Sequence, residues 1–194
     1  MNKVLWVDTE TTGLNPAKCT VHQVAGMIMV DGKLQEEFNL MFRPAEGAVV
    51  EKGALQVSGL TLEDVNSRDL SSFDAYTIFD NLLCTYVNKF SKEDKFVLAA
   101  YNANFDAGFL NAWYNTHGNK YFFGLCQGGA YLDPLQMALL LEIKEGEKIF
   151  RPDRKLVTVA KHYGVKLDNA HDALADIKAT RGVCAKIWGD LFHE

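Results

Sequence analysis

Residues 3–14 read KVLWVDTETTGL, an apolar run that leads into two acids, Asp8 and Glu10, and ends beyond a glycine. The apolar part, residues 3–8, is typical of a buried β-strand. Side chains two positions apart in an extended chain point to the same side, so the two carboxylates converge where the strand ends. A hard cation such as Mg²⁺ or Mn²⁺ relieves the repulsion between them. Two solvated acids at a turn are the alternative, and this segment alone does not decide.

The segments around this strand follow an α/β pattern. A loop is predicted over residues 9–20, a strand over 21–30, a hairpin turn at Asp31-Gly32 and a third strand over 33–43. A fourth strand, buried on both faces, is predicted over 96–101. Helices are predicted over 71–90, 104–116, 133–141, 156–163 and 173–192. Residues 118–129 have no assignment. An opening strand meander followed by alternating elements predicts an α/β fold, a mixed central sheet flanked by helices.

Composition limits the class of protein. The 194 residues are 48% hydrophobic and 23% charged, with no low-complexity linker and no repeat, so a single domain over residues 1–194 is expected. No apolar run suits a signal peptide or a membrane span. The four cysteines form no CxxC pair and are interpreted as free thiols in a reducing cytoplasm. A net charge of −5 argues against coating of long nucleic acid, but not against an enzyme that grips a strand end.

A second polar segment, residues 102–106, follows the fourth predicted strand and reads NANFD. Asp106 falls in the first turn of the next helix, where a negative charge is favourable without any further function. Either Asn102 or Asn104 could cap that helix. Taken alone, the segment therefore fits ordinary helix capping as well as it fits a functional site.

A third segment, residues 171–176, reads HDALAD. Five helical residues rotate through about 500°, so His171 and Asp176 face apart if both are helical. They converge if His171 precedes the helix and Asp176 lies just over one turn inside it. Asp172 is then expected as the N-cap. The alternative for His171 is a histidine in a surface loop. The other four histidines have no acidic neighbours at such spacing and are interpreted as structural or solvated.

Together, the three segments resemble the DEDDh branch of the DnaQ-like 3′–5′ exonucleases, the family of bacterial polymerase proofreading subunits, ribonuclease T and oligoribonuclease. That family has an acid-x-acid-T-x-G motif, then N-x-x-F-D, then H-x(4)-D near the C-terminus. The matching residues, in the same order, are Asp8, Glu10, Thr11, Gly13, Asn102, Phe105, Asp106, His171 and Asp176. The resemblance covers nearly the whole chain and implies a ribonuclease H-like fold, which agrees with the predicted meander.

The resemblance also implies a role for each acid. Two divalent cations, Mg²⁺ or Mn²⁺, are expected, with Asp8 bridging both. Glu10 and Asp176 would complete the shell of one ion, and Asp106 would support the other. His171 is expected to be the general base, because the ordinary pKa of histidine lies near neutrality.

Stacking and apolar contacts, which are largely indifferent to base identity, are expected to hold the terminal nucleotide. The expected contact residues are Thr9, Thr12, Gly13, Leu14, Leu60, Asn102 and Phe105. Residues 56–60 resemble a segment of the family in which an apolar residue wedges beside the terminal base, so Leu60 is the expected wedge. The family often has His-Gly-Ile in this segment, and Ser58 departs from that pattern. Tyr101 stands where the family often has a histidine that is not a metal ligand.

The sequence thus predicts an enzyme that hydrolyses phosphodiester bonds from the 3′ end of DNA, preferably single-stranded, and releases nucleoside 5′-monophosphates. One alternative is an exoribonuclease that trims RNA or short oligoribonucleotides, because DNA and RNA differ at the 2′-hydroxyl and no motif reads it. A noncatalytic binding module would have lost at least one acid, and all four are present. A free-standing cytoplasmic enzyme without membrane contact is expected, and a homodimer or a complex with a polymerase or repair protein stays open.

Overall fold

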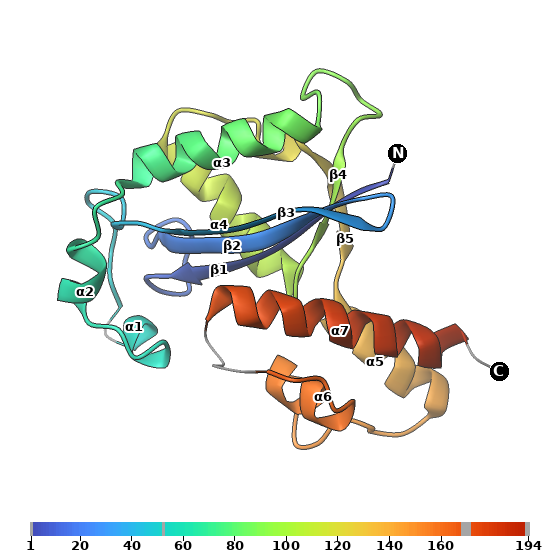
Figure 1. The fold of residues 1–194 in the computed structure, drawn as a ribbon. Coiled ribbons are helices and arrows are strands. Elements are labelled where there is room, and N and C mark those ends of the chain that lie inside the picture. The colour runs from blue at the N-terminus through green and yellow to red at the C-terminus, as the bar shows by residue number, and fades with distance from the viewer. Residues whose placement is uncertain (1, 52, 168–171, 193–194) are drawn as a thin grey trace.

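A five-stranded mixed sheet forms the centre of the structure, a computed structural model that describes residues 2–51, 53–167 and 172–192 (Figure 1). The strands lie in the order β3-β2-β1-β4-β5. Their bounds are β1 Lys3–Thr11, β2 Val21–Val30, β3 Lys33–Met41, β4 Phe96–Ala99 and β5 Cys126–Leu132. The first three pair antiparallel, whereas β4 is parallel to β1 and β5 is parallel to β4. This arrangement confirms the predicted α/β class with a mixed sheet.

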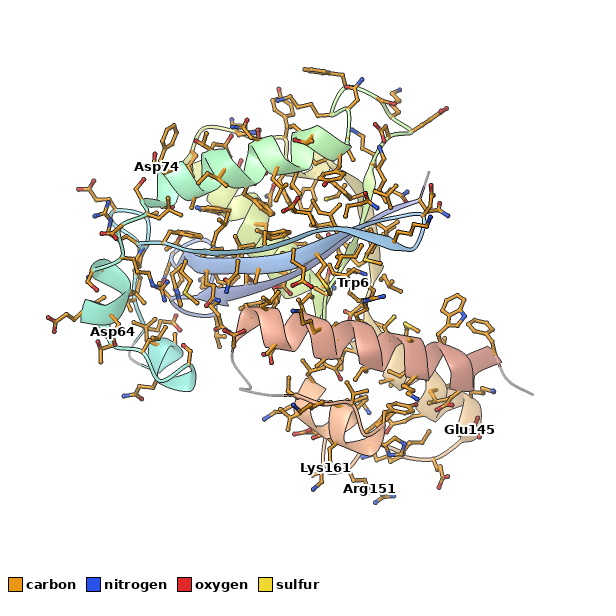
Figure 2. All side chains as sticks on the ribbon, in the orientation of Figure 1. Trp6, Asp64, Asp74, Glu145, Arg151 and Lys161 are labelled. Carbon is orange, nitrogen blue, oxygen red and sulfur yellow. The ribbon has the colours of Figure 1, made fainter. Side chains whose placement is uncertain are left out.

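Helices cover both faces of the sheet (Figure 1). Their bounds are α1 Ala54–Val57, α2 Leu62–Asn66, α3 Ser72–Tyr86, α4 Ala103–Thr116, α5 Pro134–Glu145, α6 Leu156–His162 and α7 Ala173–Phe192, with a 3₁₀ turn at Phe122–Gly124. Apolar side chains of α3 and α4 join one core with Leu5 and Val7. Trp6 points to the other face and packs in a second core with Ile177 of α7 (Figure 2). The period-2 alternation of β1 therefore separates two helical layers.

The sequence predicts several elements at their observed bounds. The strand over 21–30 and the helix over 173–192 are confirmed, as is the turn at Asp31 and Gly32, whose φ angles of 48° and 77° are those of a type I′ hairpin. The remaining predicted helices and strands are confirmed with ends that differ by up to four residues. β1 continues three residues beyond Asp8, because its end pairs with the start of β2.

Four elements have no counterpart in the sequence prediction. Residues 118–129, left unassigned, hold the 3₁₀ turn and the start of β5. β5 is an edge strand whose middle is exposed and contains Gly128 and Gly129, so it shows no apolar alternation. The helices α1 and α2 are only four and five residues long, too short for a helical period to show in sequence.

All four cysteines are free thiols, as predicted, and three of them are buried. Among the described residues, none of the helices combines the length and the apolar character that crossing a membrane requires.

Candidate active site

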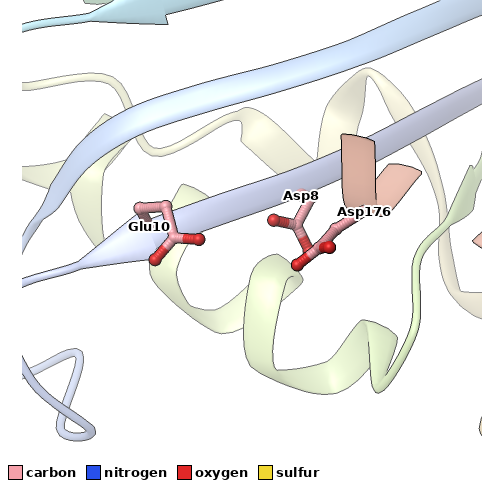
Figure 3. A group of neighbouring side chains, drawn as sticks. All are labelled: Asp8, Glu10 and Asp176. Carbon is pink, nitrogen blue, oxygen red and sulfur yellow. The ribbon is translucent and has the colours of Figure 1, made fainter. Parts of the chain in front are cut away.

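Three carboxylates from two elements meet at one end of the sheet. Asp8 and Glu10 lie on β1, on the same side as Trp6, and so face α7, where Asp176 lies in the first turn. One oxygen from each of the three lies within 4.8 Å of the others. Figure 3 shows Asp8 and Asp176 pointing toward one another, with Glu10 farther along β1. The structure therefore brings these three predicted site residues together.

The start of α7 fixes the position of Asp176. The carboxylate of Asp172 accepts a hydrogen bond from the backbone N–H of Ala175 at 3.0 Å, which confirms Asp172 as the N-cap. The backbone N–H of Asp176 donates to the carbonyl of Asp172 at 2.9 Å, so Asp176 lies one turn inside the helix. His171 lies outside the described residues, and its role stays a prediction.

The fourth acid approaches from the other face of β1. Asp106, in the first turn of α4, is only 3% exposed. Its Oδ1 accepts hydrogen bonds from the backbone N–H of Thr9 at 2.9 Å and from the Thr9 hydroxyl at 2.8 Å. Because Thr9 stands between Asp8 and Glu10 in β1 and points the opposite way, it joins α4 to the strand that carries the acids. The sequence predicts Thr9 as a nucleotide contact and does not show this positioning role.

The surroundings of Asp8, Glu10 and Asp106 oppose the negative charge of each of these carboxylates. Burial, and then the negative charges of Asp106 and Glu10, raise the pKa of Asp8 well above its usual value. Burial and the charge of Asp176 raise the pKa of Glu10 to about 7. Burial also raises the pKa of Asp106 to about 7, although the hydrogen bonds from Thr9 act against it. A hard divalent cation relieves mutual repulsion among carboxylates, so the three clustered acids fit such a cation.

A cavity of about 390 Å³ opens beside Glu10. Its walls include four of the predicted nucleotide contacts: Thr9, Gly13, Leu14 and Phe105. The lining also contains Thr11 and three residues that sequence reasoning missed, Glu51, Gly53 and Ala54. Glu51 and Gly53 belong to the connection between β3 and α1 and Ala54 begins α1, and no motif or periodic pattern marks any of them. The cavity combines apolar walls with a few polar groups, as small-molecule sites do.

Gly13 is required where the cavity meets the core. A Cβ atom at this position would lie 2.5 Å from Sγ of Cys19 and 2.6 Å from Cδ of Glu51. Both distances are far below van der Waals contact, so only glycine allows Glu51 and the buried Cys19 to approach this closely.

The other three predicted contacts lie outside this cavity. Thr12 is fully buried, and its hydroxyl donates to the carbonyl of Val49 at 2.7 Å. Leu60 is half-buried, just beyond α1. Asn102 is exposed at the start of α4 in a left-handed conformation, with φ of 68°, and lines a different cavity. Contact between these side chains and a substrate stays a prediction.

The sheet order, the helices on both faces and the acids at one end of the central strand together define a ribonuclease H-like nuclease fold. The comparison with known sequences gives the family: residues 5–183 match the family described as RNase_T, Exonuclease. The chain belongs to this exonuclease family, which confirms the resemblance carried by the three motifs.

Similar proteins include polymerases, an exonuclease and solved exonuclease structures. A PolC-type DNA polymerase III of Lacticaseibacillus paracasei is 28% identical over 173 residues, which is 89% of this chain and 10% of that protein. The 3′-5′ DNA exonuclease Cap18 of Escherichia coli is 28% identical over 120 residues, 61% of this chain and 60% of that protein. The E. coli exonuclease I–single-stranded DNA complex in its zinc-bound form superimposes with a TM-score of 0.79 at 22% identity.

The exonuclease I match covers 99% of this chain and 41% of that one, and at this identity it shows the ribonuclease H-like fold alone. The chain thus spans about a tenth of the polymerase, three fifths of Cap18 and two fifths of exonuclease I.

Proposed function

We propose that the chain is a 3′–5′ exonuclease that hydrolyses DNA, preferably single-stranded, from its 3′ end and releases nucleoside 5′-monophosphates. The observation that carries the proposal is the cluster of Asp8, Glu10 and Asp176, with oxygens within 4.8 Å of one another, beside a cavity of about 390 Å³. A cavity of this volume falls in the range that accommodates a small ligand such as one nucleotide.

Two divalent cations are the proposed cofactors, with Mg²⁺ or Mn²⁺ suited to an all-oxygen set of ligands. Asp8 would bridge both ions, with Glu10 and Asp176 on one and Asp106 on the other. When bound, such ions neutralise charge on the phosphate and make a water molecule more acidic. The pKa values raised by mutual repulsion support this assignment, because bound cations would compensate charges that the protein itself opposes.

The protein groups would then position the substrate and move one proton. Gly13, Leu14 and Phe105 would hold the terminal nucleotide in the cavity that they line. A water oxygen attacks the phosphorus, and the bond to the 3′ oxygen of the preceding nucleotide breaks. His171 would accept the proton of the water as general base. The released nucleotide carries the 5′ phosphate, and the departing 3′ oxygen takes a proton from solvent to become the 3′ hydroxyl of the shortened strand.

DNA is the proposed substrate because the similar proteins include a DNA polymerase, a DNA exonuclease and an exonuclease bound to single-stranded DNA. RNA remains the second candidate, because the 2′-hydroxyl distinguishes the two and none of the motifs reads it. A cytoplasmic location, a homodimer and a polymerase or repair complex remain proposals that rest on the sequence alone.

Strands of DNA and RNA with the same base order, each labelled at the 5′ end, test this proposal. With Mg²⁺, single-stranded DNA should shorten progressively from its 3′ end, faster than duplex DNA and RNA. EDTA should abolish shortening, and added Mg²⁺ or Mn²⁺ should restore it. Full activity in chelator contradicts the metal assignment, and faster shortening of RNA supports the exoribonuclease instead.

A further inference from the structure

A second cavity, of about 560 Å³, opens at the start of α4. Its lining includes Tyr101 and Asn102, together with several residues of the connection from α5 to α6, namely Lys148, Phe150 and residues 152–155. Leu135 and Leu156 are among the apolar side chains that line it. The metal cluster and the nucleotide cavity described above do not use this space.

A buried carboxylate holds the connecting loop in place. Oε1 of Glu142, on α5, accepts hydrogen bonds from the backbone N–H groups of Ile149 and Phe150 at 3.0 and 3.1 Å. Its Oε2 forms an ion pair with Arg154 at 2.6 Å. Burial alone raises the pKa of Glu142, but the hydrogen bonds from Phe150 and Arg154 outweigh it, so the net pKa is lowered and the group is charged at neutral pH. The Tyr101 hydroxyl also donates to the carbonyl of Arg154.

Two lysines at the rim of the second cavity, Lys148 and Lys155, can offer positive charge to a ligand. Glu142 neutralises Arg154, whereas Lys148 is exposed and forms no ion pair with any residue that the structure describes. The side chain of Lys155 is 82% exposed, and its ammonium lies 3.8 Å from Asp153, a distance at which a surface pair contributes little. Arg151 points away from the molecule at its lower edge in Figure 2 and does not line the cavity.

The second cavity adjoins the site of the four acids. Asn102, at its wall, lies four residues before Asp106, about 6 Å along a helix axis. Phe105, on the same turn, lines the nucleotide cavity. The carboxylate of Asp133 accepts hydrogen bonds from the backbone N–H groups of Asn102 and Ala103 at 3.0 and 3.1 Å, which fixes this turn against α5. One rigid turn therefore separates the two cavities.

We propose that the second cavity binds the single-stranded nucleotides immediately 5′ to the one that is removed. This inference rests on the proposed function, which places the terminal nucleotide beside Phe105. Lys148 and Lys155 would contact phosphates as compact point charges. A base would stack on Tyr101 and the apolar lining, a contact that does not depend on base identity. In a chain of net charge −5, the two exposed lysines at this rim outnumber Asp153, the one acid of the lining, and so favour a polyanionic strand over an apolar ligand.

The double substitution Lys148→Gln, Lys155→Gln tests this assignment through binding alone. Lys92→Gln, Lys120→Gln is the matched control, because both lysines are exposed and lie away from the second cavity. Lys92 precedes the start of β4, and Lys120 follows the end of α4. Every protein carries Asp8→Asn so that the strand stays intact, and the anisotropy of a 5′-fluorescein oligothymidylate is measured over a range of salt concentrations. The slope of log affinity against log salt should become shallower by about 0.7 for each phosphate that a lysine no longer neutralises.

Weaker binding and a shallower slope in the Lys148/Lys155 variant, with the control unchanged, support the inference. Equal slopes in both variants, or an equal weakening of binding in both, overturn it. Displacement of the labelled strand by polyglutamate as readily as by unlabelled DNA also overturns it, because the rim would then attract any polyanion. The proposed function fails by a different result. A protein with the native Asp8 would then bind the strand but would not shorten it in the presence of Mg²⁺.

Discussion

Asp8 is a residue whose negative charge the structure opposes strongly. It is the centre of the carboxylate group, with Glu10 two positions along the same strand and Asp176 facing it from α7. Its pKa is raised well above the usual value by burial and by the neighbouring charges. Side chains whose ionised form is destabilised by their surroundings are common at functional sites, where a bound ligand compensates the charge.

Asp8→Asn should therefore separate activity from stability. We expect kcat for linear DNA to fall by about 10³-fold or more, because one change removes a ligand of both proposed ions. In chelator, the melting temperature should stay equal or rise, because the change relieves repulsion in the metal-free cluster. Asp69→Asn, at an exposed position, is the matched control for the removal of one charge. Near-normal turnover with unchanged metal affinity in Asp8→Asn would refute the assignment.

Glu10 gives the metal-free protein a specific pH dependence. Its pKa rises from an ordinary 4.5 to about 7 in the folded chain, so the folded state holds the proton more tightly than the unfolded state. The resulting stability is fully present below pH 4.5 and is lost as the pH rises through 7. In chelator, wild type should lose up to about 3 kcal/mol across this window relative to Glu10→Gln, whose amide does not titrate.

Denaturant unfolding at several pH values in chelator measures this difference. His22, whose pKa is lowered to about 4 by burial and by Arg68, titrates in both proteins and cancels in the comparison. Excess Mg²⁺ should remove the difference in pH dependence if the cation neutralises the cluster. If stability depends on pH in the same way for wild type and Glu10→Gln in chelator, burial and the neighbouring acids do not raise the pKa of Glu10.

At the scale of elements, the loop after β1 joins the core to the nucleotide cavity. Gly13→Ala places a methyl group against the buried Cys19 and against Glu51, and we expect a loss of about 1–3 kcal/mol of stability with an increased KM for DNA. Cys19→Ala in the same protein should restore part of the stability. Gly53→Ala is the control for stability, because its added Cβ meets nothing within 4 Å. Equal melting temperatures for Gly13→Ala and Gly53→Ala would show that the loop adjusts to the added methyl group without loss of stability.

Elements with a strong local pattern could be predicted from the sequence, and those shaped by tertiary contacts could not. β2 and α7 have the bounds that their apolar patterns indicate, and the hairpin follows from Asp31-Gly32. β5 is an exposed edge strand with two adjacent glycines, and it pairs only because β4 lies beside it. Residue spacing likewise predicts the acids of the cluster, but not Glu51, which reaches the cavity through the path of the connection from β3.

At the scale of the whole molecule, charge and shape favour action at a strand end. The net charge of −5 gives little attraction for long stretches of nucleic acid. Both cavities, of about 390 and 560 Å³, open on the first turn of α4, next to the acids. We expect the terminal nucleotide rather than an internal one to enter the nucleotide cavity, because a 3′-terminal nucleotide has no further chain on its 3′ side to accommodate. The central claim is therefore that cleavage requires a free 3′ end.

A comparison of circular and linear single-stranded DNA of identical sequence tests that claim most directly. With Mg²⁺ present, the linear strand should be degraded to nucleoside 5′-monophosphates by wild type and left intact by Asp8→Asn. The circular strand should stay intact with wild type, because it offers no end to the cavity beside Glu10. Once the circle is cut by an unrelated endonuclease, its degradation should begin. Cleavage of the intact circle at a rate comparable to that of the linear form would contradict the account and indicate an endonuclease.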